Sequence, residues 1–105
     1  MTPLETLKAA RQLISDPAKW TQGELARDAD GEQVPPLDDN ATCWCSIGAM
    51  RKVCGPKVNF YDGAFRRLYF KVPSKGMVSD FNDTHTHAEV LALFDAAIAE
   101  LEGAT

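Results

Sequence analysis

The thiols and imidazoles of this sequence are its candidate nucleophiles and soft metal ligands: Cys43, Cys45, Cys54, His85 and His87. Zinc takes four such ligands, or three and a water. The spacing does not fit, because structural zinc sites pair cysteines two to four residues apart, and a Cys-x-Cys pair on a helix directs its thiols about 200° apart. Cys43 and Cys54 also fall on the apolar face of an expected helix. The sequence therefore predicts packed thiols, with no metal and no cofactor.

Cys45 is the candidate nucleophile, because it falls near the start of the same expected helix. The helix dipole and free N–H groups lower the pKa of a thiol at such a position. His87 or His85 would act as the base, and Asp83 or Asn82 would orient it, as in Cys-His-Asn hydrolases. The spacing does not constrain such a triad, since triads assemble in three dimensions. A non-catalytic role is therefore favoured, and a thiol-dependent enzyme is the alternative.

An acidic turn, Asp28-x-Asp30-Gly31, is similar to the start of a calcium-binding loop. Such a loop needs a bidentate Glu at its twelfth position and a glycine at its sixth. Here the twelfth residue is Asp39 and the glycine is the fourth. The motif therefore predicts a turn and not a calcium site.

Basic and aromatic side chains are interleaved in the segment 61–72, a composition also found where proteins bind single-stranded nucleic acid. Tyr61, Phe65 and Leu68 have the spacing of a buried stripe, so we expect Tyr69 and Phe70 to be the exposed aromatics. An exposed aromatic more simply marks a contact with another protein. A protein partner or self-association is therefore favoured over nucleic acid.

The formal net charge of −4 is an average over three zones. Residues 24–39 and 80–102 are acidic, and residues 51–75 are basic apart from Asp62. We expect the basic zone to form surface ion pairs with an acidic one. An acidic last helix also disfavours a phosphate-rich partner beside it.

The chain has 105 residues, of which 45% are hydrophobic and 25% charged, so it fits a single domain spanning 1–105. A stretch of about 18 apolar residues, which a membrane-spanning helix would need, is absent. The first residues carry no basic region followed by an apolar stretch, so no secretory signal is expected. The expected location is the cytoplasm, where cysteines remain thiols.

Apolar spacing and capping residues predict an α+β fold that is mainly α, with about four helices. Two capping boxes, Thr2 with Glu5 and Thr86 with Glu89, mark the starts of the first and last helices. The middle helices are expected over 43–54 and 61–72, and 77–81 is expected to be extended. Gly48, inside a helix, indicates a close approach by a neighbouring segment.

A small two-stranded β-hairpin is expected between the first two helices, within residues 20–36. Asp30-Gly31 between two short extended runs is a hairpin turn signal. Pro35 and Pro36 must leave the ladder, because proline has no N–H to donate.

Several segments together resemble one protein family, over roughly residues 5–101: Trp20-Thr21-Gln22-Gly23, 26–31, 43–49, Phe81-Asn82-Asp83 and 86–98. The chain resembles an uncharacterised family of small bacterial and phage proteins, the domain of unknown function 6197. The resemblance implies no activity, cofactor or partner, because none is established for the family.

If these segments form a ligand site, it lies where the start of the Cys45 helix, the Asn82-Asp83 turn and Arg27-Asp28 converge. Its expected members are Arg27, Asp28, Trp44, Cys45, Asn82 and Asp83. Two helix N-termini at that point would favour an anion or a small polar ligand. The favoured function remains that of a small non-catalytic cytoplasmic or phage-encoded domain, acting through protein–protein contacts or as a homo-oligomer.

Overall fold

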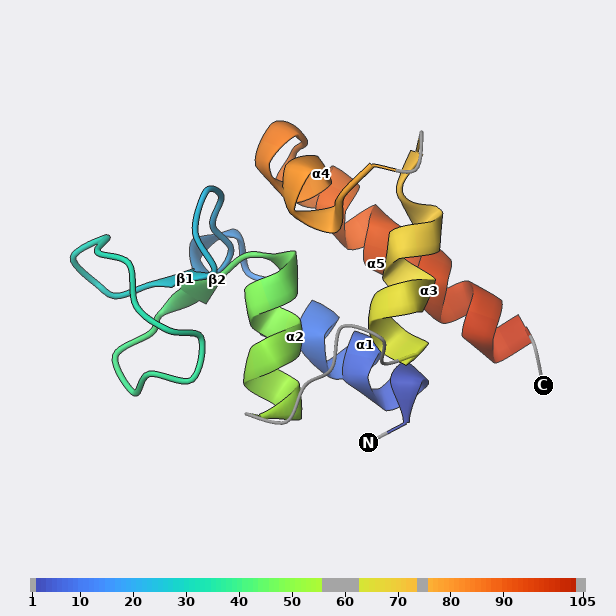
Figure 1. Cartoon of the computed structure of the whole chain (residues 1–105), viewed down its shortest axis with the longest axis horizontal. Helices are drawn as coiled ribbons and strands as arrows, with labels where there is room; N and C mark the ends of the chain where they lie inside the picture. The colour runs from blue at the N-terminus through green and yellow to red at the C-terminus, as the bar shows by residue number, and fades with distance from the viewer. Residues whose placement is uncertain (1, 56–62, 74–75, 104–105) are drawn as a thin grey trace.

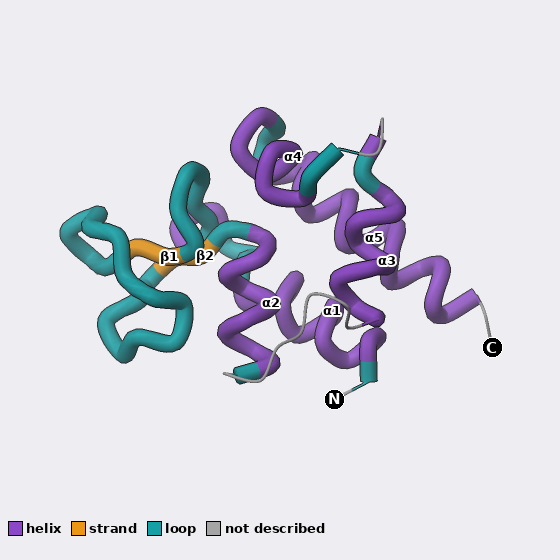
Figure 2. The backbone as a smooth tube through the Cα atoms, in the orientation of Figure 1, coloured by secondary structure: helices purple, strands orange, loops and turns teal. Residues whose placement is uncertain are grey.

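The computed structural model describes residues 2–55, 63–73 and 76–103. Its elements follow in the order α1 (Pro3–Leu13), η1 (a 3-10 turn, Pro17–Lys19), β1 (Ala26–Arg27), β2 (Cys43–Trp44), α2 (Ser46–Cys54), α3 (Gly63–Lys71), α4 (Val78–Thr84) and α5 (His87–Gly103). The helices form one body, and the sheet with its loops projects from it beside α2 (Figure 1). Loops make up most of that projection (Figure 2). The predicted fold class, mainly α with a two-stranded antiparallel sheet between the first two helices, is confirmed.

Local capping fixes where the first and last helices begin. Thr2 Oγ1 accepts from the Glu5 amide at 3.1 Å, and the Thr2 amide donates to Glu5 Oε1 at 2.9 Å. The Glu89 amide donates to Thr86 Oγ1 at 3.2 Å, and the Thr86 amide donates to Glu89 Oε1 at 2.9 Å. Both predicted capping boxes are therefore present, and each satisfies amides that the first helical turn leaves free.

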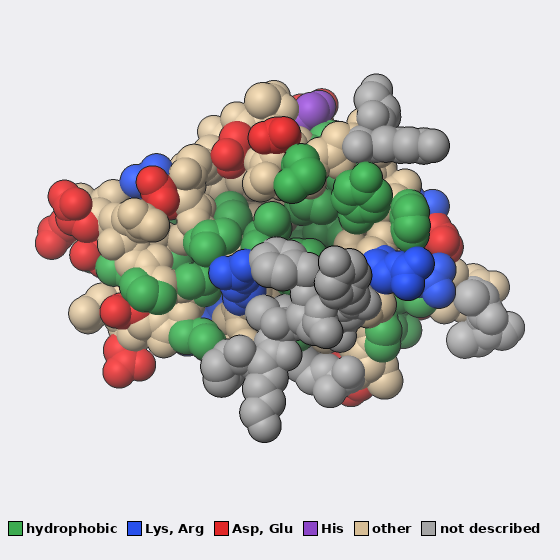
Figure 3. All heavy atoms as spheres, in the orientation of Figure 1, with side chains coloured by type: hydrophobic (Ala, Val, Ile, Leu, Met, Phe, Trp, Pro, Cys, Tyr) green, Lys and Arg blue, Asp and Glu red, His purple; other side chains and the backbone are tan. Residues whose placement is uncertain are grey.

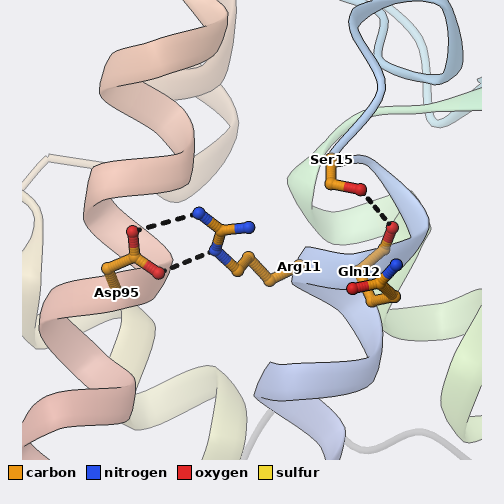
Figure 4. Close-up of polar contacts among 4 residues, drawn as sticks. All are labelled: Arg11, Gln12, Ser15 and Asp95. Carbon is orange, nitrogen blue, oxygen red and sulfur yellow. Dashed lines mark hydrogen bonds and ion pairs between the residues drawn. The ribbon is translucent and has the colours of Figure 1, made fainter.

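Helix α1 lies at the centre of the packing and touches α2, α3 and α5. Its buried stripe includes Leu7 and Ala10, and Ile14 follows at its C-terminal end; all three are fully buried. On its outer side Arg11 reaches α5, where Nε donates to Asp95 Oδ1 at 2.7 Å and Nη2 to Oδ2 at 3.2 Å (Figure 4). This pair is solvent-exposed and worth less than about 1 kcal/mol, so apolar burial dominates the contact between α1 and α5.

The segment expected to be extended over 77–81 is helical, so there are five α-helices among the described residues and not four. Val78 and Asn82, four residues apart, are buried on the same side of α4, and the Phe81 amide donates to the Met77 carbonyl at 3.0 Å. The alternation of apolar residues was misleading because Met77 faces outward and the polar Asn82 faces the interior.

The sheet pairs different residues from those predicted. The turn at Asp28–Gly31 forms, with the Gly31 amide donating to the Asp28 carbonyl at 3.0 Å. The return strand makes only a single bridge, Arg27 with Gln33. The ladder partner of β1 is instead β2, with Ala26 opposite Trp44 and Arg27 opposite Cys43. Trp44 is thereby buried, and this burial is not visible in local turn signals.

The helix expected from Cys43 begins at Ser46, so Cys43 lies on a strand. Cys43 and Cys54 are half-buried, and Cys45 is the buried thiol. Placing Cys43 in the core was therefore wrong, because the helical phase does not extend back to it. Cys54, the last residue of α2, is also only half-buried, and its thiol lies beside Thr6 Oγ1 at 3.6 Å. Tyr61, at the expected start of the third helix, lies outside the described residues, whereas Phe65 and Leu68 are buried as predicted, and Val72 is buried with them.

Gly48 lies against the backbone of Leu25, so the close approach predicted at this glycine is present. A Cβ built there would lie 1.9 Å from the carbonyl oxygen of Leu25. Helix α2 and the segment before β1 are therefore in backbone contact, at a distance that leaves no room for a Cβ unless the backbone shifts.

Gly48→Ala should lower the free energy of unfolding by about 3 kcal/mol, because the methyl group must displace the backbone near Leu25. Gly103→Ala is the matched control, since nothing lies within 4 Å of a Cβ at that position. It should leave stability unchanged or slightly higher, because alanine favours a helix. Urea denaturation of the two variants tests this, and equal stabilities would contradict it.

Candidate functional site

The side-chain amide of Asn82 is fully buried and receives three hydrogen bonds at a single oxygen. Oδ1 accepts from Trp20 Nε1 at 2.8 Å, from the Ser46 amide at 3.0 Å and from Ser46 Oγ at 2.8 Å. Ser46 is the first residue of α2, whose leading amides have no partner within the helix. Asn82 therefore serves both the N-terminus of α2 and the indole that follows η1.

The nitrogen of the same amide completes its bonding. Nδ2 donates to the Thr21 carbonyl at 3.0 Å and to Asp83 Oδ1 at 3.1 Å. Asp83 Oδ1 also accepts from the Gly23 amide at 2.9 Å. The Asn82 side chain thus uses its donors and its acceptor within the protein, and joins α4, α2 and residues 20–23.

The other expected site residues bond within the same region. Arg27 donates to Thr21 Oγ1 and to the carbonyls of Gly31 and Gln22, each at 3.1 Å. Asp28 Oδ1 accepts from the amides of Asp30 and Glu32 at 2.9 and 3.0 Å. These contacts hold the loops on either side of β1 in place.

Cys45 is the N-cap of α2, with its Sγ accepting from the Gly48 amide at 3.3 Å. Its side chain is 4% exposed, and burial raises the pKa of the thiol. The Asp83 carboxylate nearby raises this pKa further, against the opposing effect of the helix amides. A hollow of about 160 Å³ lies at this point, lined by Gly23, Glu24, Leu25, Cys45, Ser79 and Asp83.

Neither histidine makes a hydrogen bond or ring contact with Cys45 in the described part of the chain. His87 Nε2 donates to the Ile14 carbonyl at 2.7 Å, and its ring lies 5.4 Å from that of Trp20. His85 Nδ1 donates to the Phe81 carbonyl at 3.0 Å, and the ring stacks on Phe81 at 3.8 Å. The structure therefore brings Asp83 to the Cys45 hollow and holds both imidazoles through other partners.

All six expected ligand residues (Arg27, Asp28, Trp44, Cys45, Asn82 and Asp83) make hydrogen bonds within the protein. Asn82 joins the start of α2 to Asp83, whereas Asp28 bonds within its own turn and Trp44 to Pro36. A ligand site at these residues stays a prediction. Within residues 2–55, 63–73 and 76–103, no group of three or more His, Cys, Asp or Glu side chains is placed to hold a metal ion. No helix in these ranges has the length and apolar character needed to cross a membrane.

An apolar groove of about 550 Å³ lies where α2, α3 and α4 meet. The sequence predicted only two of its residues, the exposed Tyr69 and Phe70. We call it the groove; its lining comprises Ile47, Phe65, Arg66, Tyr69, Phe70, Met77 and Val78. Phe70 is 66% exposed, Met77 59% and Tyr69 40%. Figure 3 shows hydrophobic side chains gathered on this face. The exposure predicted for Tyr69 and Phe70 is confirmed, whereas Met77 was missed because α4 was not predicted.

The cations of α3 differ in their partners. Arg67 pairs with Glu100 at 3.4 Å, and Lys71 pairs with the same carboxylate. These contacts realise the expected pairing of the basic zone with the acidic last helix. Arg66 lies on the groove side instead, with its guanidinium carbon 6.0 Å from the centre of the Phe70 ring, and it forms no ion pair with a described carboxylate.

Comparison with known proteins adds one result. The model of a family of unknown function, DUF6197, matches residues 1–100. The chain is a member of DUF6197. No curated protein and no solved structure shows significant similarity to this DUF6197 protein. The family match confirms the resemblance noted in the sequence and assigns no activity.

Asn82→Leu should lower the free energy of unfolding by at least about 3 kcal/mol. The leucine has nearly the same size but leaves Trp20 Nε1, the Ser46 amide and the Thr21 carbonyl without partners, and each such group costs about 1–3 kcal/mol. Ser46→Ala, which removes only the hydroxyl, should cost about 1 kcal/mol. Urea denaturation measures both, and a loss below that of Ser46→Ala would contradict the central role of Asn82.

Iodoacetamide at neutral pH should modify Cys45 more slowly than Cys43 or Cys54. Its pKa is raised, so the reactive thiolate forms only at higher pH, and burial also limits access. Mass spectrometry of the digested protein gives the three rates, and the rate at Cys45 should rise only under alkaline conditions. A Cys45 that reacts faster than the other two would instead favour the thiol-dependent enzyme.

Proposed function

We propose that this protein is a non-catalytic binding module and that the groove receives an apolar segment of a protein. The observation that carries the proposal is the exposure of Phe70, Met77 and Tyr69 around one hollow of about 550 Å³. Large apolar side chains gathered on one surface are costly to leave in water and commonly mark a contact with another molecule. The hollow exceeds the one beside Cys45 more than threefold in volume.

The composition of the groove favours a peptide or protein over a small polar ligand. Its walls are aromatic and aliphatic, and Arg66 is the one cation among the described residues that line it. Aromatic and arginine side chains are the types that carry most of the energy in protein interfaces. The expected occupant therefore presents apolar side chains together with a carboxylate.

Chemistry at Cys45 has weaker support. A nucleophilic cysteine needs a lowered pKa and a base beside it, whereas burial raises the pKa of Cys45 and both histidines bond elsewhere. The three cysteines are free thiols, which fits the cytoplasm, where we place the protein.

Peptides selected from a random phage-displayed library on the immobilised protein should bind the groove. Phe70→Ser and Met77→Ser should each weaken the affinity of a selected peptide by about tenfold or more, as truncation of a central interface residue does. Fluorescence anisotropy measures the affinity, and NMR shift mapping should place the peptide against α3 and α4.

Leu37→Ser is the matched control, since Leu37 is an exposed leucine outside the groove. In dilute protein, where copies do not associate, it should bind the peptide as the wild type does. Selected peptides that bind Phe70→Ser with undiminished affinity would contradict the proposal.

A further inference from the structure

Four large hydrophobic side chains are exposed among the described residues, and three of them, Tyr69, Phe70 and Met77, belong to the groove. The fourth is Leu37, which is 41% exposed on the connection between β1 and β2. Figure 1 shows α2 between this connection and α3, so the connection that carries Leu37 lies across α2 from the α3 side chains of the groove. One copy therefore exposes an apolar projection and an apolar hollow that it cannot bring together.

Leu37 is held on a fixed turn. The Asp38 amide donates to the Pro35 carbonyl at 3.0 Å, which closes a turn whose first two residues are prolines with fixed φ. The buried Trp44 indole donates to the Pro36 carbonyl at 3.0 Å and ties the turn to β2. A side chain presented on such a fixed turn loses little conformational entropy when it binds.

The charges around the two features are complementary. Asp38 and the exposed Asp39 follow Leu37, and the whole connection, residues 28–42, contains five acidic residues and no Lys or Arg. The groove offers Arg66 beside Phe70, a cation without an ion pair to any described carboxylate. An apolar residue followed by carboxylates matches an apolar hollow edged by a guanidinium.

We propose that the occupant of the groove is a second copy of this chain. Leu37 of one copy lies in the groove of the next, and Asp38 and Asp39 face Arg66. This inference rests on the proposed function, because it names the partner of the same groove. The contact uses different surfaces on the two copies, so it is head-to-tail, and it produces either an open chain of copies or a closed ring.

Sedimentation velocity over a wide range of protein concentration tests this. The wild type should grow beyond a dimer or close into a ring as concentration rises, whereas Leu37→Ser and Phe70→Ser should each raise the dissociation constant by about tenfold or more. An equimolar mixture of these two variants should form a dimer and stop there, because only one intact projection and one intact groove remain. Unchanged circular dichroism and thermal midpoints establish that both variants fold.

A charge exchange tests the ionic part of the contact. Arg66→Glu should weaken association and Asp39→Lys should do the same, whereas the double variant should regain part of the wild-type affinity. Added salt should weaken the wild-type association, because it screens exposed charges.

Two results would overturn the inference: a wild type that stays monomeric at every concentration, or a Leu37→Ser variant that associates as the wild type does. Either result leaves the groove as a peptide site if selected peptides still lose affinity on Phe70→Ser. Insensitivity of those peptides to Phe70→Ser would instead overturn the proposed function itself.

Discussion

One buried amide, that of Asn82, governs how the loops of this protein attach to its helices. The sheet between the loops has only two residue pairs, and its Ala26 and Trp44 belong to the hydrophobic core. Polar contacts add to this attachment, because the amide of Asn82 supplies an acceptor to Trp20 and Ser46 and a donor to Thr21. In a buried setting such bonds matter less for their own strength than for the cost of leaving any partner unpaired.

The sequence predicts best what is decided locally. Both capping boxes and the buried positions Phe65 and Leu68 of α3 depend on residues three or four positions apart, and all of them are present. Helix α4 and the pairing of β1 with β2 could not be inferred in this way. Asn82 is polar and has no local signal for burial, and β1 pairs with a strand that lies beyond the predicted hairpin.

The candidate sites also combine features set by nearby residues with features set by contacts distant in sequence. Residue types drew attention to Asn82, Asp83, Arg27 and Cys45. Asn82 bonds to Asp83, whereas Arg27 bonds to Thr21 and Cys45 to the Gly48 amide, and the sequence did not reveal these partners. The exposure of Phe70 follows from helical spacing alone. The groove also needs a third wall, which Met77 and Val78 at the start of α4 provide. A surface made by three elements is a tertiary property, and no single segment encodes it.

The position of Asn82 in the chain also orders the folding reaction. Its bond to the Trp20 indole spans 62 residues, so during synthesis the first half of the protein leaves the ribosome before its acceptor exists. Contacts of such sequence separation slow folding, because a long segment of chain must be closed before they contribute. The nascent loops thus remain open to chaperones and proteases until α4 emerges, and docking of α4 completes the half of the molecule that was made first.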